Sequence, residues 1–144
     1  MRISKQDHRI IKAAVKAKLH SYAPFSGFRV GAALLSSDGE IVTGCNVEIS
    51  SYSLTICAER TAIFKAYSMG KRSFKALAIT TDSEELIPPC GACRQVITDL
   101  APGIQVILTT SKGKSKRFKA EALLPYPFTG RLLRNKRANE HGRS

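Results

Sequence analysis

Pro88-Pro89-Cys90-Gly91-Ala92-Cys93-Arg94-Gln95 is the stretch around which this chain is organised, and Cys57-Ala58-Glu59-Arg60 is its upstream partner. The two prolines disfavour a helix before Cys90, whereas residues 93–100 carry apolar side chains at helical spacing. Residues 58–67, directly after Cys57, show the same helical pattern. Both stretches therefore place cysteines at the start of a helix.

Three cysteines in this arrangement are typical of a metal site. A Cys-x-x-Cys pair at a helix N-terminus can turn both sulfurs toward one point, and the positive end of the helix favours the thiolate form that zinc binds. Cys57 can approach the same point from a second helix. Three thiolates favour zinc and leave a fourth coordination position for water, as catalytic sites do. A closed structural site, with Cys45 or a histidine as fourth ligand, is the alternative.

Glu59 lies two residues after Cys57, in the first turn of the predicted helix. Zinc lowers the pKa of a bound water to about 7, and a nearby carboxylate can carry protons between that water and a substrate. We therefore predict that Glu59 is the proton carrier, although the helix dipole alone also favours an acidic residue here. Arg60 and Arg94, each next to a ligand, could donate hydrogen bonds to the sulfurs and offset the negative charge of three thiolates.

The other segments predict an α/β fold. An amphipathic helix over residues 4–20, capped by Ser4, precedes two strands at 28–35 and 40–46 that an Asp38-Gly39 turn joins. We expect further strands at 75–81, 104–109 and 116–118, and further helices at 58–67, 93–100 and 121–124. Because strands and helices alternate after the leading hairpin, a three-layer arrangement of a sheet covered by helices is predicted.

The composition is that of one globular domain. The 144 residues are 43% hydrophobic and 24% charged, and no apolar run approaches the roughly 18 residues of a membrane span. The N-terminus lacks the apolar centre of a signal peptide, so we expect a cytoplasmic protein. Of the net charge of +12, residues 111–144 contribute +8, from ten basic and two acidic side chains. We expect a folded domain over residues 1–130 and a basic, flexible tail over 131–144.

Cys57-Ala58-Glu59 and Pro89-Cys90-Gly91-Ala92-Cys93 resemble the zinc deaminase signature in its three-cysteine form, in which a non-ligand glutamate moves the protons. Over about residues 5–130 the chain resembles the small, homotetrameric cytidine deaminases. Further stretches carry this resemblance: Tyr22-Ala23-Pro24-Phe25-Ser26, Val30-Gly31-Ala32-Ala33-Leu34, Gly44-Cys45-Asn46-Val47-Glu48 and Leu123-Leu124-Pro125. The resemblance implies a three-layer α/β/α fold with a mixed sheet, a Zn²⁺ cofactor and active sites shared within a homotetramer. It also implies hydrolysis of cytidine and deoxycytidine to uridine and deoxyuridine with release of ammonia, a reaction of pyrimidine salvage.

Carried over by position, the resemblance also implies the substrate contacts. Asn46 and Glu48 would hydrogen-bond the ribose hydroxyls, which suits an amide and a carboxylate two residues apart on an extended strand. Phe28 would line the pyrimidine pocket. Phe128 would reach the site of a neighbouring subunit and stack on the base, a role for which Tyr126 competes.

Rival functions stay open at this point. One is deamination of another aminopyrimidine nucleoside, such as blasticidin S, and the pair Ile49-Ser50, where the family commonly has Asn-Ala, puts substrate preference in question. Another is a nucleic-acid-binding or editing deaminase, which the charge of +12 suggests. The basic excess lies mainly beyond the motifs, with little aromatic interleaving, so we expect a small nucleoside as partner and neither nucleic acid nor membrane. A third is a zinc scaffold without activity.

Overall fold

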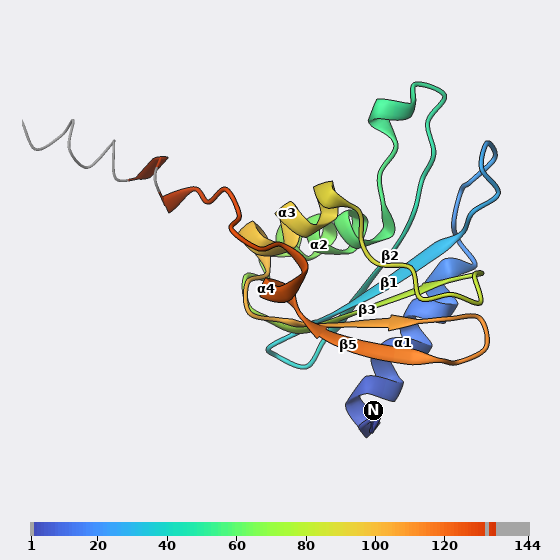
Figure 1. Cartoon of the computed structure of the whole chain (residues 1–144), viewed down its shortest axis with the longest axis horizontal. Coiled ribbons are helices and arrows are strands. Elements are labelled where there is room, and N and C mark those ends of the chain that lie inside the picture. Colours follow the sequence, from blue (N-terminus) through green and yellow to red (C-terminus); the bar gives the residue numbers. More distant parts are fainter. Residues whose placement is uncertain (1, 132, 135–144) are drawn as a thin grey trace, which may run out of the picture.

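The protein is described by a computed structural model, in which residues 2–131 and 133–134 are placed. Most of the expected tail over 131–144 therefore lies outside the described residues. The helices and strands, drawn in Figure 1, are α1 (Lys5–Lys18), β1 (Val30–Ser36), β2 (Ile41–Cys45), a 3-10 turn η1 (Tyr52–Leu54), α2 (Ala58–Ser68), β3 (Phe74–Thr81), α3 (Gly91–Leu100), β4 (Gln105–Thr109), β5 (Ser115–Lys119) and α4 (Ala120–Leu123).

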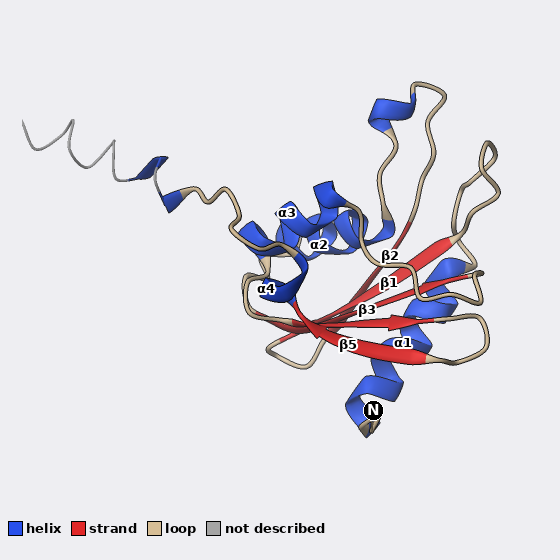
Figure 2. Cartoon of the chain, viewed as in Figure 1, coloured by secondary structure: helices blue, strands red, loops and turns tan. Residues whose placement is uncertain are grey.

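The five strands form one mixed sheet in the order β2-β1-β3-β4-β5. Strands β3 and β4 are parallel, and the other neighbouring pairs are antiparallel. Helix α1 covers one face, and α2 and α3 cover the other (Figure 2). The predicted three-layer α/β/α fold with a mixed sheet is confirmed.

Two separate cores lie on the two faces of the sheet. Successive side chains of a strand point to opposite faces, so Leu34 packs in the core beneath α2 and α3 whereas Leu35 packs in the core beneath α1. Gly44 lets α2 approach the sheet closely, since a Cβ atom there would lie 2.5 Å from the carbonyl oxygen of Ala58. That contact fixes the first turn of α2, which follows Cys57.

Most predicted elements are found within about two residues of their expected ends, as local patterns allow. Ser4 caps α1 in a capping box with Asp7, which also forms an ion pair with Arg117 of β5. Gly39 and Gly70 adopt positive φ angles at the hairpin turn and after α2, where other residues would be strained. Within the part of the chain that the structure describes, no helix is long and apolar enough to span a membrane.

Candidate active site

The three motif cysteines meet between the N-termini of two helices. Cys57 is the N-cap of α2, Cys90 is the N-cap of α3, and Cys93 lies in the first turn of α3. Their three sulfur atoms lie within 4.8 Å of one another. No other cysteine or histidine of the described residues joins this group, and Cys45 lies on β2 outside it. The described residues therefore offer three ligands to a metal, which leaves the fourth coordination position of zinc open for water.

The spacing of the sulfurs fits zinc. The Sγ atoms of Cys57 and Cys90 are 3.7 Å apart. Two thiolates bound tetrahedrally to zinc, at about 2.3 Å each, lie about 3.8 Å apart, whereas a disulfide would bring them to about 2.05 Å. The cysteines are thus already arranged as zinc ligands, and the geometry supports Zn²⁺ as the cofactor.

The pKa values of the Cys57 and Cys93 thiols are shifted in opposite directions. A hydrogen bond from Cys93 lowers the pKa of Cys57 to about 5, with further help from Arg60, and outweighs the effect of burial. The same hydrogen bond, together with burial, raises the pKa of Cys93. The protein therefore holds one thiolate ready before a metal binds, which is the form that zinc requires.

Arg60 contacts the cluster from α2. Its Nη2 atom donates a hydrogen bond to the sulfur of Cys57 over 3.4 Å, and this bond raises the pKa of the guanidinium. The buried Nε atom of Arg60 has no hydrogen-bond partner among the described residues. This is the contact that the sequence predicts for Arg60, and we propose that it balances the charge of the thiolates.

Replacing Arg60 with glutamine should weaken zinc binding by about 10 to 100-fold, the usual effect of removing a hydrogen bond to a metal ligand. Competition with a chelator measures the affinity, and Arg9→Gln, on the exposed side of α1, removes an equal charge as the matched control. Unchanged zinc affinity and turnover in Arg60→Gln would show that Arg60 does not support the metal.

Arg94 does not make the contact that the sequence predicts. Its Nε atom donates to the carbonyl oxygen of Pro89 over 2.8 Å, and its Nη1 atom donates to that of Leu123 over 2.8 Å. Adjacent residues on a helix are rotated by about 100°, so the neighbour of Cys93 points away from its sulfur. The hydrogen bonds of Arg94 join the loop before Cys90 to the end of α4, and they support the ligands through the backbone.

Glu59 is the second residue of α2 and is 4% exposed. Burial raises the pKa of its carboxyl group to about 7, because the ionised form loses its hydration, and the nearby Cys57 thiolate adds to the shift. A carboxyl group with a pKa near 7 can both accept and donate a proton at neutral pH. The environment of Glu59 therefore suits the predicted proton carrier.

A cavity of about 280 Å³ lies beside these residues. Its wall includes six of the residues singled out from the sequence: Phe28, Asn46, Glu48, Cys57, Glu59 and Cys90. Sequence reasoning did not identify several others that complete it, among them Thr55, Thr81 and Ile87. Phe128 is not part of this wall and is 64% exposed. The described chain thus gathers the predicted ribose and base contacts, apart from Phe128, around one cavity.

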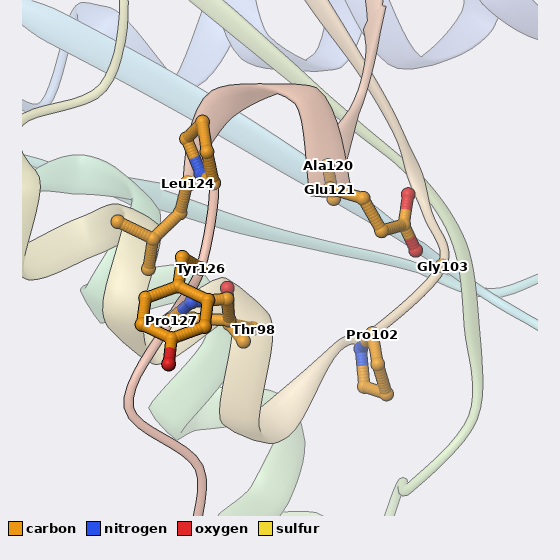
Figure 3. Close-up of a pocket in the computed structure, with 9 residues that line it drawn as sticks. Thr98, Pro102, Gly103, Ala120, Glu121, Leu124, Tyr126 and Pro127 are labelled. Carbon is orange, nitrogen blue, oxygen red and sulfur yellow. The ribbon is translucent and has the colours of Figure 1, made fainter.

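A second cavity, of about 240 Å³, lies between the end of α3 and the segment after α4 (Figure 3). Prolines, Leu124 and Thr98 line most of it, and Glu121 and Tyr126 are its titratable side chains. It includes none of the motif cysteines. The chemistry of the motifs therefore belongs to the first cavity.

The side chain of Asn46 is held by two backbone groups and by the hydroxyl of Ser21. Its Oδ1 atom accepts hydrogen bonds from the amide of Val30 over 2.9 Å and from the hydroxyl of Ser21, and its Nδ2 atom donates to the carbonyl oxygen of Phe28 over 2.7 Å. An amide nitrogen carries two hydrogens, so one remains to donate into the cavity. Asn46 therefore both fixes the strand that follows Phe28 and offers one donor.

Glu48 is held in a similar way by the loop before β1. One of its oxygens accepts hydrogen bonds from the amides of Phe25 and Ser26, over 3.0 and 3.1 Å. Hydrogen bonding by Ser26 and Phe25 lowers the pKa of the Glu48 carboxyl group. The group is therefore ionised at neutral pH, and its second oxygen can accept from a ligand.

Comparison with known proteins agrees with this site. Residues 4–109 match the family described as the cytidine and deoxycytidylate deaminase zinc-binding region. The chain belongs to the cytidine deaminase family. It is 52% identical to the cytidine deaminase of Sporosarcina psychrophila over 122 residues, which is 84% of this chain and 90% of that protein. The crystal structure of cytidine deaminase from Burkholderia pseudomallei covers 84% of this chain and 98% of its own, with a TM-score of 0.82 and 47% identity.

The rival deaminase is a more distant relative. The chain is 30% identical to the blasticidin-S deaminase of Bacillus cereus over 135 residues, covering 88% of this chain and 95% of that protein. The family relationship confirms the resemblance inferred from the motifs and identifies the protein as an enzyme. It also removes the zinc scaffold from consideration.

Proposed function

We propose that the protein hydrolyses cytidine and deoxycytidine to uridine and deoxyuridine and releases ammonia. The observation that carries this proposal is the buried carboxyl group of Glu59 beside three sulfurs at zinc-site spacing, in a cavity whose wall also holds Asn46 and Glu48. Zinc, when bound to Cys57, Cys90 and Cys93, supplies a water that is acidic enough to lose a proton at neutral pH.

Glu59 would carry that proton. Its carboxyl group would accept a proton from the attacking water and donate it to the pyrimidine ring, and it would then move a second proton from the newly attached hydroxyl to the departing amine. Burial raises the pKa of the Glu59 carboxyl group to about 7 in the metal-free chain, because the ionised form loses its hydration. The backbone of the first turn of α2 holds Glu59 and Cys57 in one rigid element, so the carrier and one ligand keep a constant separation.

The charge of the cavity favours a free nucleoside over a nucleotide. None of its described wall residues is basic, and Glu48 contributes a carboxylate. A 5′-phosphate would therefore find no positive partner and would be repelled. We propose that Asn46 and Glu48 bind the ribose hydroxyls and that Phe28, which is 39% exposed, packs against the base.

We also propose that the protein works as a homotetramer in which Phe128 completes a neighbour's site. The backbone carbonyl of Phe128 accepts a hydrogen bond from Gln95 over 2.9 Å, while the aromatic side chain is exposed and is not part of the chain's own cavity wall. Tyr126 is also fully exposed. The mass in solution, measured by light scattering, tests the assembly. Cytoplasmic pyrimidine salvage is the role that we propose for this reaction.

The substrate can be tested by following the absorbance change of deamination with cytidine, deoxycytidine, deoxycytidylate and blasticidin S. We expect turnover of the two nucleosides, and at least a tenfold lower kcat/KM, about 1.4 kcal/mol of transition-state stabilisation, for the nucleotide and the antibiotic. A preference for blasticidin S would favour the rival deaminase. Equal use of deoxycytidylate would contradict the charge argument at Glu48.

A further inference from the structure

Helix α1 carries a straight row of basic side chains. Spacings of four, three and four residues bring side chains onto one face of a helix. The buried side chains Ile10 and Ala14 occupy the opposite face, against the sheet. All members of the row are exposed, and we call them the basic row: Lys5, Arg9, Lys12 and Lys16.

The basic row has no acidic partners. Among the described residues, no ion pair or side-chain hydrogen bond involves any of its four members. The one acidic residue of α1, Asp7, is buried and pairs with Arg117. Like charges three or four residues apart repel one another on a helix, and Lys5 stands in the first turn, where the helix dipole disfavours a cation. Lys16 lies in the last turn, where the dipole favours a cation, but the other three members gain no such stabilisation from their own helix.

Strand β5 enlarges this basic surface. The ion pair between Asp7 and Arg117 joins the N-terminal turn of α1 to β5, the edge strand of the sheet (Figure 1). Arg117 is paired in register with Ile107, which packs in the core beneath α1, so Arg117 and Lys119 point to that same side. Asp7 balances the charge of Arg117, so Lys119 is the cation that β5 adds. The basic row, Arg117 and Lys119 form one surface, which we call the basic face.

The basic face lies away from the catalytic cavity. Helix α1 covers one side of the sheet, and the helices that carry Cys57 and Cys90 cover the other. A large anion on the basic face therefore does not occupy the nucleoside site. The same face of a second copy is a poor partner, because a two-fold contact would bring the basic rows of the two copies against each other.

We propose that the basic face binds the phosphate backbone of nucleic acid without reading its bases. The row spans twelve residues of helix and is about 16 Å long from first to last, which corresponds to about five base pairs of duplex. Helix α1 has no Phe, Tyr or Trp on which a base could stack. An anionic membrane is the less suitable partner. Helices that lie in a membrane interface insert a broad apolar face. At α1 and its C-cap, the only large exposed apolar side chains are Val15 and Leu19.

This inference goes beyond the proposed function and departs from the sequence-based expectation of no nucleic acid. That expectation concerned a nucleic-acid-binding or editing deaminase and rested on the basic excess of residues 111–144, which lies mainly beyond the motifs. Folding instead gathers cations from α1 and β5 on the face opposite the cavity. The nucleic acid would be a scaffold to which the enzyme binds, and free nucleoside would remain the substrate.

The test uses the full-length zinc-loaded protein and two unrelated labelled DNA duplexes of about 20 base pairs. Fluorescence anisotropy between about 50 and 200 mM salt should show binding that is equal for both sequences and falls steeply with salt. In the variant Lys5→Gln/Arg9→Gln/Lys12→Gln/Lys16→Gln we expect at least tenfold weaker binding at about 50 mM salt and a log–log salt slope smaller by about 3 to 4. Its turnover of cytidine should not change.

A matched variant, Lys65→Gln/Lys75→Gln/Lys114→Gln/Arg131→Gln, removes the same charge from exposed positions outside the basic face. We expect it to retain most of the wild-type affinity. Three results would overturn the proposal: no binding by the wild type at about 50 mM salt, equal loss in both variants, or tighter binding to phosphatidylserine vesicles than to DNA. Equal loss would mean that net charge alone is responsible, and preference for vesicles would mean a membrane partner.

Discussion

Glu59→Gln should reduce kcat for cytidine by at least about 10² to 10⁴-fold while leaving zinc bound. Glutamine keeps the shape of the side chain but cannot accept a proton, so the step that general acid–base catalysis accelerates is lost. Zinc should remain because the three sulfurs of the cluster are untouched. Steady-state rates and the metal content of the purified variant measure the two quantities.

The same variant should be at least as stable as the wild type. Burial raises the pKa of Glu59, which means that the folded protein disfavours its ionised form, and a neutral amide removes that penalty. Glu121→Gln, at an exposed position, is the matched control and should keep full activity. A fully active Glu59→Gln enzyme would refute the proposed mechanism, and loss of zinc from it would assign Glu59 a role in holding the metal.

The parts of this structure that the sequence predicts are those set by neighbouring residues. Pro88-Pro89 and the apolar spacing after Cys93 place the start of α3, and Asp38-Gly39 places the hairpin turn, because backbone geometry and side-chain period act locally. The cysteine spacing then predicts the metal cluster, since each motif cysteine lies at a helix N-terminus. These features need no knowledge of the strand order.

The parts that escaped prediction depend on residues far apart in the chain. Arg94 was expected to contact a sulfur, but its partners include Leu123, which only the path of α4 brings close. The hydrogen bonds between Asn46 and Ser21 join segments 25 residues apart. The ion pair of Asp7 with Arg117 joins residues 110 apart. Sequence patterns carry no signal for such pairs, because the sheet order that creates them comes from tertiary packing.

The basic face shows the same limit for charge. Residues 111–144 carry most of the positive net charge of the sequence. The density of charge on the surface, however, depends on which side chains the fold brings together. The members of the basic row are scattered over twelve positions in the sequence but share one side of α1. Position on a helix, and not the total charge, is what would decide whether a phosphate backbone can follow them.

Replacing Cys93 with serine should remove zinc and reduce activity further than the Glu59 variant does, beyond about 10⁴-fold. Cys93 is fully buried between the two helices, so neither water nor a neighbouring side chain can readily replace its sulfur, and a serine hydroxyl does not ionise to the form that zinc binds. Metal analysis after dialysis, activity with added zinc, and melting curves with and without chelator measure these effects. In the wild type the chelator should lower Tm, whereas in Cys93→Ser it should have no effect.

Cys45→Ser is the matched control, because it removes the fourth cysteine by the same chemical change. Cys45 lies on β2 outside the sulfur cluster, so its sulfur is not placed to bind the same metal ion. We expect Cys45→Ser to keep its zinc and its rate. Loss of zinc from this control would mean that Cys45 closes a four-ligand site, and such a site would leave no position for the water that Glu59 is proposed to deprotonate. Retention of zinc by Cys93→Ser would contradict the three-sulfur site directly.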